Sequence, residues 1–488
     1  MNSTLNQSGP WRDLLALVGL AAACRLLFLL AMPRVLDSAD AIHYVETAAR
    51  LASGDFFGYD PKIPIFYPLL GAFASLVFAD MEQACRAVSL VASVLTVIPV
   101  YLLARDLHGT APARIAGLIF ALWPWLIDYA SRVSTEATAV LLWTGGVWLF
   151  ARGMRRGGAA VAGAAACFFA LSLTRPEGLF VLLATAGALP VLCGWRERRA
   201  WRRFAAFAGL AALLVIANTF YVRALTGQTT ANYRAGFIVE EFAYQRFVQT
   251  AVETFSDVIP VMLGPLLFLF LGVGFFQARD RARDPRLEAT VLFFAAAQWG
   301  LSLFVLSPAP RYLMAPLIVL SMWSACGMHL AAGQIRAWRA RPAWLARLPL
   351  VAVILFFLGH AAITVGSEHL GRRPREPREY KEAGLWMAAN LTPGLIFTRK
   401  PQVGFYAGMP STGPAPDDSL AEALDRARAA GAAYVVVDER YTAAMVPGLR
   451  PLLDPAAEHP GLRRLKTFES YPESRVVVYA LAPAPDDR

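Results

Sequence analysis

The chain has 488 residues, of which 57% are hydrophobic and 17% are charged, and its formal net charge is +10. Soluble domains usually contain about a quarter charged residues, so the composition excludes an ordinary soluble protein and predicts a membrane protein with a smaller soluble part. The basic residues stand in short clusters between apolar runs, which indicates membrane topology rather than nucleic-acid binding.

A bilayer-spanning helix needs about 20 mostly apolar residues, and about eleven segments meet this requirement. We expect them near residues 12–32, 69–104, 112–130, 134–151, 159–174, 178–194, 204–225, 256–277, 288–307, 312–332 and 348–366. Alternate loops are rich in arginine, and the positive-inside rule places these loops in the cytoplasm together with the N-terminus. The loops 33–68 and 226–255 then lie on the outer side of the membrane.

The first loop, 33–68, is too polar to stay in a bilayer. Its polar residues include Asp37, Asp40, His43, Tyr44, Glu46, Asp55 and Lys62. A carboxylate such as Asp40 can act as a general base on a hydroxyl group, whereas Asp37 or Ser38 can cap the helix expected at 39–52. The two roles are compatible. His43 and Tyr44 are expected to be neighbours of the site.

Lys62 precedes Tyr67 at the point where the chain returns to the membrane. The lysine can bind a lipid phosphate, or it can extend its charged end to the membrane interface. Arg25 lies about 10 Å inside the first helix, using a rise of about 1.5 Å per residue. An intramembrane arginine is costly and usually has a partner; the candidates are Asp128 and Glu136, and the alternative to a functional role is a structural ion pair.

Arg175 and Glu177 stand on either side of Pro176 between two expected helices, and Arg311 precedes Tyr312 after a proline-rich turn. The planar guanidinium group suits a phosphate diester, so both arginines are candidate ligands of a donor phosphate. Arginines at the outer ends of helices can also serve as interface anchors.

The loop 226–255 is long and contains Arg234 among apolar residues, which predicts an amphipathic helix on the outer surface that gates a lipid cavity. Residues 371–488 have a soluble pattern and predict a small periplasmic α/β domain behind a transmembrane domain of residues 1–370. We expect helices at 379–390 and 419–430, and strands at 395–398, 434–438, 464–468 and 475–480.

The chemistry of a cofactor or metal site has little support in the sequence. There is no HExxH motif, no P-loop and no glycine-rich dinucleotide motif, and the five cysteines form no CxxC pair. We therefore expect no cofactor and no metal. Because nothing resembles nucleotide-binding machinery, an activated donor on the outer face would have to be linked to a lipid.

Five segments resemble motifs of one family in the same order. They are DAIHYVETAARLASGD from Asp40, KIPIFYPLL from Lys62, SRVSTEATAVLLW around Glu136, LTRPEGLF around Arg175 and PAPRYLMAPL around Arg311. The pattern is similar to the GT-C glycosyltransferases, especially the branch of protein O-mannosyltransferases and lipid A aminoarabinose transferases, and it covers about residues 25–330.

This resemblance implies an inverting transferase that takes a sugar from a polyprenyl phosphate at the periplasmic face. Asp40 then matches the acidic base, and Lys62 and Arg311 match positions that hold the donor phosphate. The family's acidic pair is commonly adjacent, whereas Asp37 and Asp40 are separated here, so the base is open between them; Ile63 also replaces a proline. The branch is generally regarded as independent of metal.

The acceptor can be a lipid, a surface glycan or a protein. The alternative from another class is a transporter or flippase of lipid-linked sugars. Transporters tend to have internal repeats and polar groups near the bilayer midplane, whereas the polar groups of this sequence are concentrated near one face and no repeat is visible. A scaffold whose C-terminal region binds partners is a third possibility, and it would not need Asp40.

Overall fold

The computed structural model describes residues 10–56, 63–175, 177–227, 244–278, 284–305, 310–337, 342–370, 376–454 and 456–482. The chain divides into two compact units. The membrane unit contains Met1–Leu29 and Tyr44–Ala361, and the α/β unit contains Leu30–His43 and Ala362–Arg488. The expected division into a transmembrane and a periplasmic domain at residue 370 stays a prediction.

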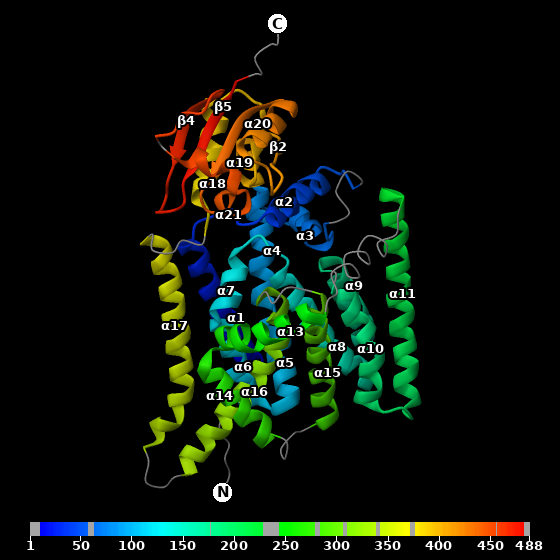
Figure 1. Cartoon of the computed structure of the whole chain (residues 1–488). Coiled ribbons are helices and arrows are strands. Elements are labelled where there is room, and N and C mark those ends of the chain that lie inside the picture. Colours follow the sequence, from blue (N-terminus) through cyan, green and yellow to red (C-terminus); the bar gives the residue numbers. More distant parts are fainter. Residues whose placement is uncertain are drawn as a thin grey trace. The chain divides into compact units, whose positions relative to one another are not determined.

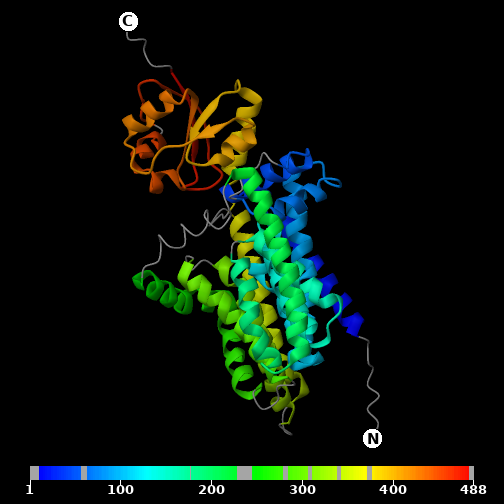
Figure 2. The ribbon, with the colours of Figure 1, turned by 90° about the vertical axis from the view of Figure 1, so that its right-hand side faces the viewer.

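The described residues of the N-terminal three quarters of the chain are mostly helical. The helices are α1 (Pro10–Ala31), α2 (Ala39–Ala52), α3 (Phe66–Ala74), α4 (Met81–Leu95), α5 (Val97–His108), α6 (Thr110–Leu122), α7 (Pro124–Ser131), α8 (Glu136–Arg156), α9 (Ala159–Thr174), α10 (Gly178–Cys193), α11 (Arg198–Thr226), α13 (Tyr244–Glu253), α14 (Ile259–Ala278), α15 (Pro285–Val305), α16 (Pro310–Ala337) and α17 (Leu348–His369). Most of the long helices in the membrane unit run close to parallel (Figures 1 and 2).

Within the described ranges, six helical segments are long and apolar enough to cross a membrane, or seven if one bent pair forms a single span. They are Trp11–Ala31, Met81–His108, Arg198–Leu225, Ile259–Phe276, Arg311–Ala337 and Trp344–His369. The protein is therefore a multi-span membrane protein, while the expected count of about eleven stays a prediction. In the most apolar stretch of the span in α16, 78% of the residues are buried, against only 17% in that of α11. Helix α16 is therefore central and α11 peripheral.

Two breaks divide segments that the sequence predicts as continuous. The expected span 69–104 contains a turn after α3, and Asp80 caps α4 by accepting a hydrogen bond from the backbone N–H of Glu82 at 2.8 Å. Helices α6 and α7 meet at an angle of 49°. Pro124 begins α7 and offers no backbone N–H, so the helix cannot continue through it unbroken.

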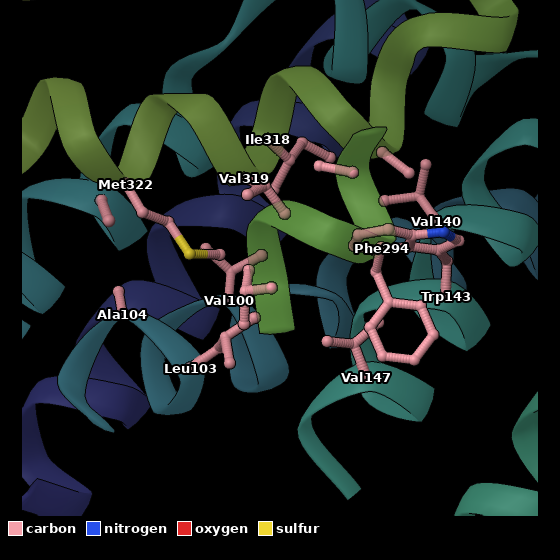
Figure 3. Close-up of a cluster of buried hydrophobic side chains, with 14 of the residues drawn as sticks. Val100, Leu103, Ala104, Val140, Trp143, Val147, Phe294, Ile318, Val319 and Met322 are labelled. Atoms are coloured by element: carbon pink, nitrogen blue, oxygen red, sulfur yellow. The ribbon is translucent and has the colours of Figure 1, made fainter. Parts of the chain in front are cut away.

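The core of the membrane unit includes side chains from α5, α8, α15 and α16, which meet near its centre. Figure 3 shows Met322 of α16 near Val100 of α5, and Phe294 of α15 near Trp143 and Val147 of α8. All five side chains are buried. Such packing fills the space between helices at the density of a protein interior.

Helices α14 and α16 cross closely at two glycines. A Cβ atom at Gly274 would clash with the carbonyl oxygen of Trp323, and one at Gly327 would clash with that of Phe270. Small residues let helix backbones approach in a membrane, where the burial of apolar surface adds little to helix association. The two glycines therefore determine how closely the central helix packs.

The α/β unit contains one five-stranded sheet in the order β2-β1-β3-β5-β4. Its elements are α18 (Arg378–Asn390), β1 (Leu395–Thr398), α19 (Pro401–Ala407), β2 (Ser411–Thr412), α20 (Leu420–Ala429), β3 (Ala432–Asp438), α21 (Thr442–Met445), β4 (Leu462–Phe468) and β5 (Val476–Leu481). Strands β2, β1 and β3 are parallel, and β5 and β4 are antiparallel to their neighbours. The two helices and four strands expected from the sequence all occur, while α19, α21 and the short β2 were not predicted.

Both faces of this sheet are covered. Alternate residues of β3 belong to different clusters: Val435 and Val437 pack with α20, and Tyr434 and Val436 pack with α18 and α19. This alternation follows from the two-residue period of a strand. The near-continuous apolar run of β3 is what a strand buried on both faces requires.

The segment that follows α1 is part of this unit. The backbone N–H of Leu36 donates to the hydroxyl of Tyr406 at 2.8 Å, and Lys381 Nζ donates to the carbonyl oxygen of Arg34 at 2.8 Å. Lys381 also lies 4.8 Å from the centre of the Tyr406 ring. Residues of α18 and α19 therefore hold the beginning of the first loop.

Candidate active site

A cavity lies at one end of the membrane unit, where α8 begins, α9 is followed by α10, and α16 begins. It is lined by Glu136, Ala139, Val140, Trp143, Leu171, Arg175, Glu177, Gly178, Gln298, Arg311, Tyr312, Met314 and Ala315. The structure thus brings together three motifs that are far apart in the sequence. They are the segments around Glu136, Arg175 and Arg311.

The turn between α9 and α10 places Arg175 and Glu177 at this cavity. Arg175 has an extended backbone (φ −147°, ψ 140°), as expected for the residue before a proline, and α9 ends at the residue before it. A Cβ atom at Gly178 would lie 2.5 Å from the backbone of Leu171, so the turn needs glycine at this position.

Arg175 is buried between two carboxylates. Its Nη1 donates to Glu136 Oε1 at 3.0 Å, and its Nε donates to Glu177 Oε1 at 2.5 Å. Nη1 also lies within reach of the Thr135 hydroxyl at 3.4 Å. One arginine therefore pairs with two carboxylates, and these largely neutralise its charge.

Tyr312 contacts both arginines of the cavity. Its ring centre lies 5.0 Å from the Cζ of Arg175 and 4.9 Å from that of Arg311. Arg311 Nη2 also donates to the tyrosine hydroxyl at 3.0 Å. Arg311 is exposed, whereas Arg175 is not. Of the two cations, Arg311 is therefore the one accessible to a ligand in the cavity.

Two further lining residues, Trp143 and Gln298, were not predicted from the sequence. Both are buried, and the indole N–H of Trp143 has no acceptor among the described residues. A buried donor of this kind usually has a hydrogen-bond partner, so an oxygen of a bound molecule or water would satisfy it. In the sequence, each of these two residues is only an uncharged polar group in an otherwise apolar run. Such residues are too common in membrane helices to indicate a site.

A buried network holds α3, α4 and the segment before α8 together. The hydroxyl of Tyr67 donates to the carbonyl oxygen of Cys85 at 2.8 Å, lies 2.9 Å from Ser89 Oγ and accepts the backbone N–H of Ser134 at 3.2 Å. The ring of Tyr44 packs edge-on against Tyr67 at 5.4 Å. Tyr67 and Tyr44 were both expected near the site. In this structure Tyr67, supported by the ring of Tyr44, holds the segment before α8 in place.

A second pair in this region was also missed. Glu82 Oε1 and Arg86 Nη2 lie 2.8 Å apart one turn along α4, and both side chains are buried. Arg86 also donates to the carbonyl oxygen of Ser131 at 2.6 Å. Two charges in an apolar helix at a spacing of four residues were the signal available in the sequence.

Arg25 is buried, but its partners differ from the expected ones. Its Nε donates to Ser93 Oγ at 2.7 Å, and its Nη atoms donate to the carbonyl oxygens of Ala121 at 3.0 Å and Phe120 at 3.4 Å. The expected pairing with Asp128 or Glu136 is therefore wrong.

The break between α6 and α7 explains the position of Arg25. In a continuous helix, the carbonyl of Phe120 would accept the N–H of residue 124, but Pro124 has none. Arg25 supplies donors to the carbonyls that this break leaves free. Asp128 instead pairs with Arg132 at 3.2 Å.

Asp37, Asp40 and His43 belong to the α/β unit. Ser38 Oγ accepts the backbone N–H of Ala41 at 3.2 Å, so Ser38 provides one of the two expected caps of α2. Asp37 is half-buried just before this helix, and Asp40 and His43 are exposed on its first turns.

Two predicted site residues, Lys62 and Arg234, lie outside the described residues. Helix α13 occurs at the end of the loop in which an amphipathic helix was expected, and its gating role stays a prediction. Among the described residues, no group of three or more His, Cys, Asp or Glu side chains could hold a metal ion.

Residues 62–222 match the family described as dolichyl-phosphate-mannose-protein mannosyltransferase. No curated protein matches the sequence significantly. Among solved structures, ArnT from Cupriavidus metallidurans bound to undecaprenyl phosphate is similar at 17% identity and a TM-score of 0.63, covering 97% of this chain and 99% of that one. The Archaeoglobus fulgidus oligosaccharyltransferase is similar at 13% identity and a TM-score of 0.63, covering 90% and 70%.

A third similar structure is the arabinofuranosyltransferase AftD from Mycobacteria, at 16% identity and a TM-score of 0.52, covering 96% of this chain and 40% of that one. Identities this low establish the fold alone, whereas the family match rests on the sequence of residues 62–222. Fold and family match agree with the resemblance seen in the sequence motifs: residues 62–222 match a glycosyltransferase family, and the chain shares the fold of ArnT and of the oligosaccharyltransferase.

Proposed function

We propose that the protein transfers a sugar from a polyprenyl-phosphate donor to an acceptor hydroxyl, with inversion, at the periplasmic face of a bacterial inner membrane. The observation that carries this proposal is the cavity in which Arg311 and Tyr312 lie beside the Glu136–Arg175 pair. Its lining combines apolar side chains such as Val140 and Leu171 with charged ones, as a site for a lipid-linked anion requires. The similar ArnT structure is bound to undecaprenyl phosphate, and a structure of the Archaeoglobus fulgidus oligosaccharyltransferase AglB is in complex with a dolichol phosphate, which supports a donor of this class.

The reaction is a single displacement. The acceptor oxygen forms a bond with the anomeric carbon while the bond from that carbon to the phosphate oxygen breaks. Asp40 takes the proton of the acceptor hydroxyl, with Asp37 as the other candidate base. The polyprenyl phosphate leaves, and its charge is stabilised by Arg311 and Lys62. No metal ion takes part in this scheme.

Arg175 has a supporting role in this proposal. Because its guanidinium group is bound by Glu136 and Glu177, it orients the ring of Tyr312, and through it Arg311, more than it neutralises a phosphate. The cost of burying Arg175 is offset by its two carboxylate partners. Arg311 is thus the proposed main phosphate ligand on this side of the site.

The test is sugar transfer by the purified full chain in nanodiscs supplied with polyprenyl phosphate sugars. Asp40→Asn and Asp37→Asn are compared with wild type, and donor binding is measured in parallel. Loss of turnover with donor binding retained in Asp40→Asn alone supports the base assignment, and loss in Asp37→Asn alone transfers it to Asp37.

If neither substitution changes turnover, neither aspartate is the base. If wild type transfers no sugar but moves lipid-linked sugars across a vesicle membrane, the protein is a transporter and the enzymatic proposal fails. The configuration at the anomeric carbon of the product, read by nuclear magnetic resonance, tests inversion separately.

A further inference from the structure

Two adjoining cavities lie at the end of α8 opposite to the candidate active site. The first is polar and is lined by Leu103, Arg105, Asp106, Thr110, Trp148, Ala151, Arg152, Arg155, Arg156, Asp284 and Leu287. The second is more apolar and is lined by Trp11, Leu14, Tyr101, Leu102, Arg105, Trp148, Leu149, Arg152, Ala159 and Ala160. The two share Arg105, Trp148 and Arg152, so they adjoin and form one hollow of two parts.

This hollow is separate from the site described above. Glu136 and Arg152 are sixteen positions apart on α8, which corresponds to about 24 Å along the helix at 1.5 Å per residue. That distance is close to the thickness of the hydrocarbon layer of a bilayer, which is about 30 Å. The two sites therefore lie near opposite faces of the membrane.

Basic groups dominate the polar cavity. Arg155 is bound by Asp284, with 3.0 Å between Nη2 and Oδ1, and Arg105 Nη2 lies 3.7 Å from Asp106 Oδ1. These two aspartates are the acidic residues of the lining, against four arginines. The polar cavity therefore carries surplus positive charge.

The surplus resides on Arg152 and Arg156. Both side chains are exposed, and neither has a carboxylate at ion-pair distance within the described part of the chain. The Cζ of Arg152 lies 5.6 Å from the centre of the Trp148 ring. Trp148 Nε1 donates to Asp106 Oδ2 at 3.1 Å, which fixes the ring between the two cavities. A ligand with a negative head group would face Arg152 and Arg156.

The adjoining cavity provides an apolar surface next to this charge. Leu14 and Tyr101 are buried in its wall, whereas Trp11 is 73% exposed. A tryptophan in this position is typical of the membrane interface. Basic pockets between helices on the cytoplasmic side of membrane proteins bind anionic lipid head groups.

We propose that this hollow binds one anionic phospholipid of the surrounding membrane. Its phosphate lies against Arg152 and Arg156, and one acyl chain follows the surface formed by Trp11, Leu14 and Leu149. The charge surplus and the continuous apolar surface together favour a lipid over a free anion. The lipid is distinct from the sugar donor of the proposed reaction and binds near the opposite face.

The test is a titration of the purified full chain in detergent with dioleoyl phosphatidylglycerol or dioleoyl phosphatidylethanolamine, followed by native mass spectrometry. We expect tighter binding of phosphatidylglycerol. The double variants Arg152→Glu/Arg156→Glu and Arg152→Gln/Arg156→Gln should each weaken that binding by at least about tenfold, because both remove the two cations that face the anionic head group. The milder glutamine variant keeps the test valid if the glutamate variant is poorly folded.

The matched control is Arg198→Glu/Arg199→Glu, two exposed arginines at the start of α11 outside both linings. This control should bind phosphatidylglycerol like wild type. Equal weakening in this control and in Arg152→Glu/Arg156→Glu would mean that only diffuse surface charge attracts the lipid, and the proposal would fail. Equal affinities for the two lipids in wild type would also overturn it.

Two further measurements separate a lipid from a free phosphate. Glycerol phosphate, which has the head group without acyl chains, should not compete with phosphatidylglycerol at equal concentration. Ala159→Trp, which fills the exposed edge of the apolar cavity, should weaken phosphatidylglycerol binding while leaving the charged residues in place. Efficient competition by glycerol phosphate, or unchanged binding in Ala159→Trp, would show that the apolar surface is not used.

Discussion

Arg175 donates to Glu136 across 39 positions of sequence, with 3.0 Å between Nη1 and Oε1, and so joins the turn after α9 to the first residue of α8. Both side chains are buried, and Arg175 forms a second ion pair with Glu177. A buried charge without its partner is costly, so this arrangement connects the stability of the fold to the shape of the cavity.

We expect Arg175→Ala to lower the free energy of unfolding by about 3–5 kcal/mol, because Glu136 and Glu177 would remain buried without their partner. The control is Arg114→Ala, which breaks the more exposed pair with Asp13 and should cost about 1 kcal/mol or less. Denaturant unfolding in mixed micelles measures both. Equal effects of the two substitutions would contradict the structural role given to Arg175.

Arg311→Ala should weaken donor use with little change in stability, because its side chain is exposed and lies over Tyr312. A hydrogen bond to a charged group contributes about 1.5–3 kcal/mol, so kcat/KM for the donor should fall by roughly ten- to a hundredfold. Steady-state kinetics with varied donor measure this effect. Arg336→Ala at the other end of α16 is the control, and a comparable loss in that variant would remove the assignment.

Arg25→Met should reduce stability although it removes a buried charge. The carbonyl oxygens of Phe120 and Ala121 would lose their donor at the break before Pro124, and a buried unsatisfied group costs about 1–3 kcal/mol. Thermal unfolding in detergent, compared with exposed Arg347→Met, measures the difference. A Tm unchanged from wild type would show that water or lipid satisfies these carbonyls.

The stability of the α/β unit should fall as pH rises through the neutral range. Burial raises the pKa of the Glu379 carboxyl from 4.5 to about 7, although Arg440 at 3.2 Å lowers it in part. Between these two values the folded state binds the proton more strongly than the unfolded state does. The stabilisation is therefore complete below about pH 4.5 and is lost as pH rises through 7, by up to about 3 kcal/mol.

Hydrogen exchange in α18, corrected for the intrinsic rate at each pH, measures this loss between pH 5 and 8. Glu379→Gln should make the protection nearly independent of pH in this range. Glu382→Gln, an exposed glutamate one turn along, should keep the wild-type slope. A wild-type slope that persists in Glu379→Gln would assign the effect to another group.

The sequence predicted two helices and four of the five strands of the α/β unit. The run Tyr434–Asp438 is apolar enough to be recognised as a buried strand, and Ser419 with Glu422 forms the capping box that begins α20. These signals are local, so they can be recognised without knowing how the rest of the chain folds. Strand β2 has only two residues, which is too short for a recognisable alternation of apolar and polar residues. It forms because its backbone pairs in parallel with the edge of β1.

The candidate site was predicted as separate motifs and not as an arrangement. Arg175, Glu136 and Arg311 were each singled out because a charge beside a membrane segment is unusual. Their assembly around Tyr312 depends on which ends of α8, α9 and α16 meet. The wrong partners expected for Arg25 have the same origin, since the need for a partner is visible in the sequence but the free carbonyls at a helix break are not.

The sequence by itself determined that this is a multi-span membrane protein with an α/β portion and with motifs that resemble those of the GT-C glycosyltransferases, because hydropathy, charge clusters and local periodicity act over short distances along the chain. Only the tertiary structure decided that Arg175 is bound by two carboxylates while Arg311 stays accessible, and that Arg152 and Arg156 line a polar cavity beside a more apolar one. Such choices depend on distances between helices, and these follow from side-chain packing that no local pattern encodes.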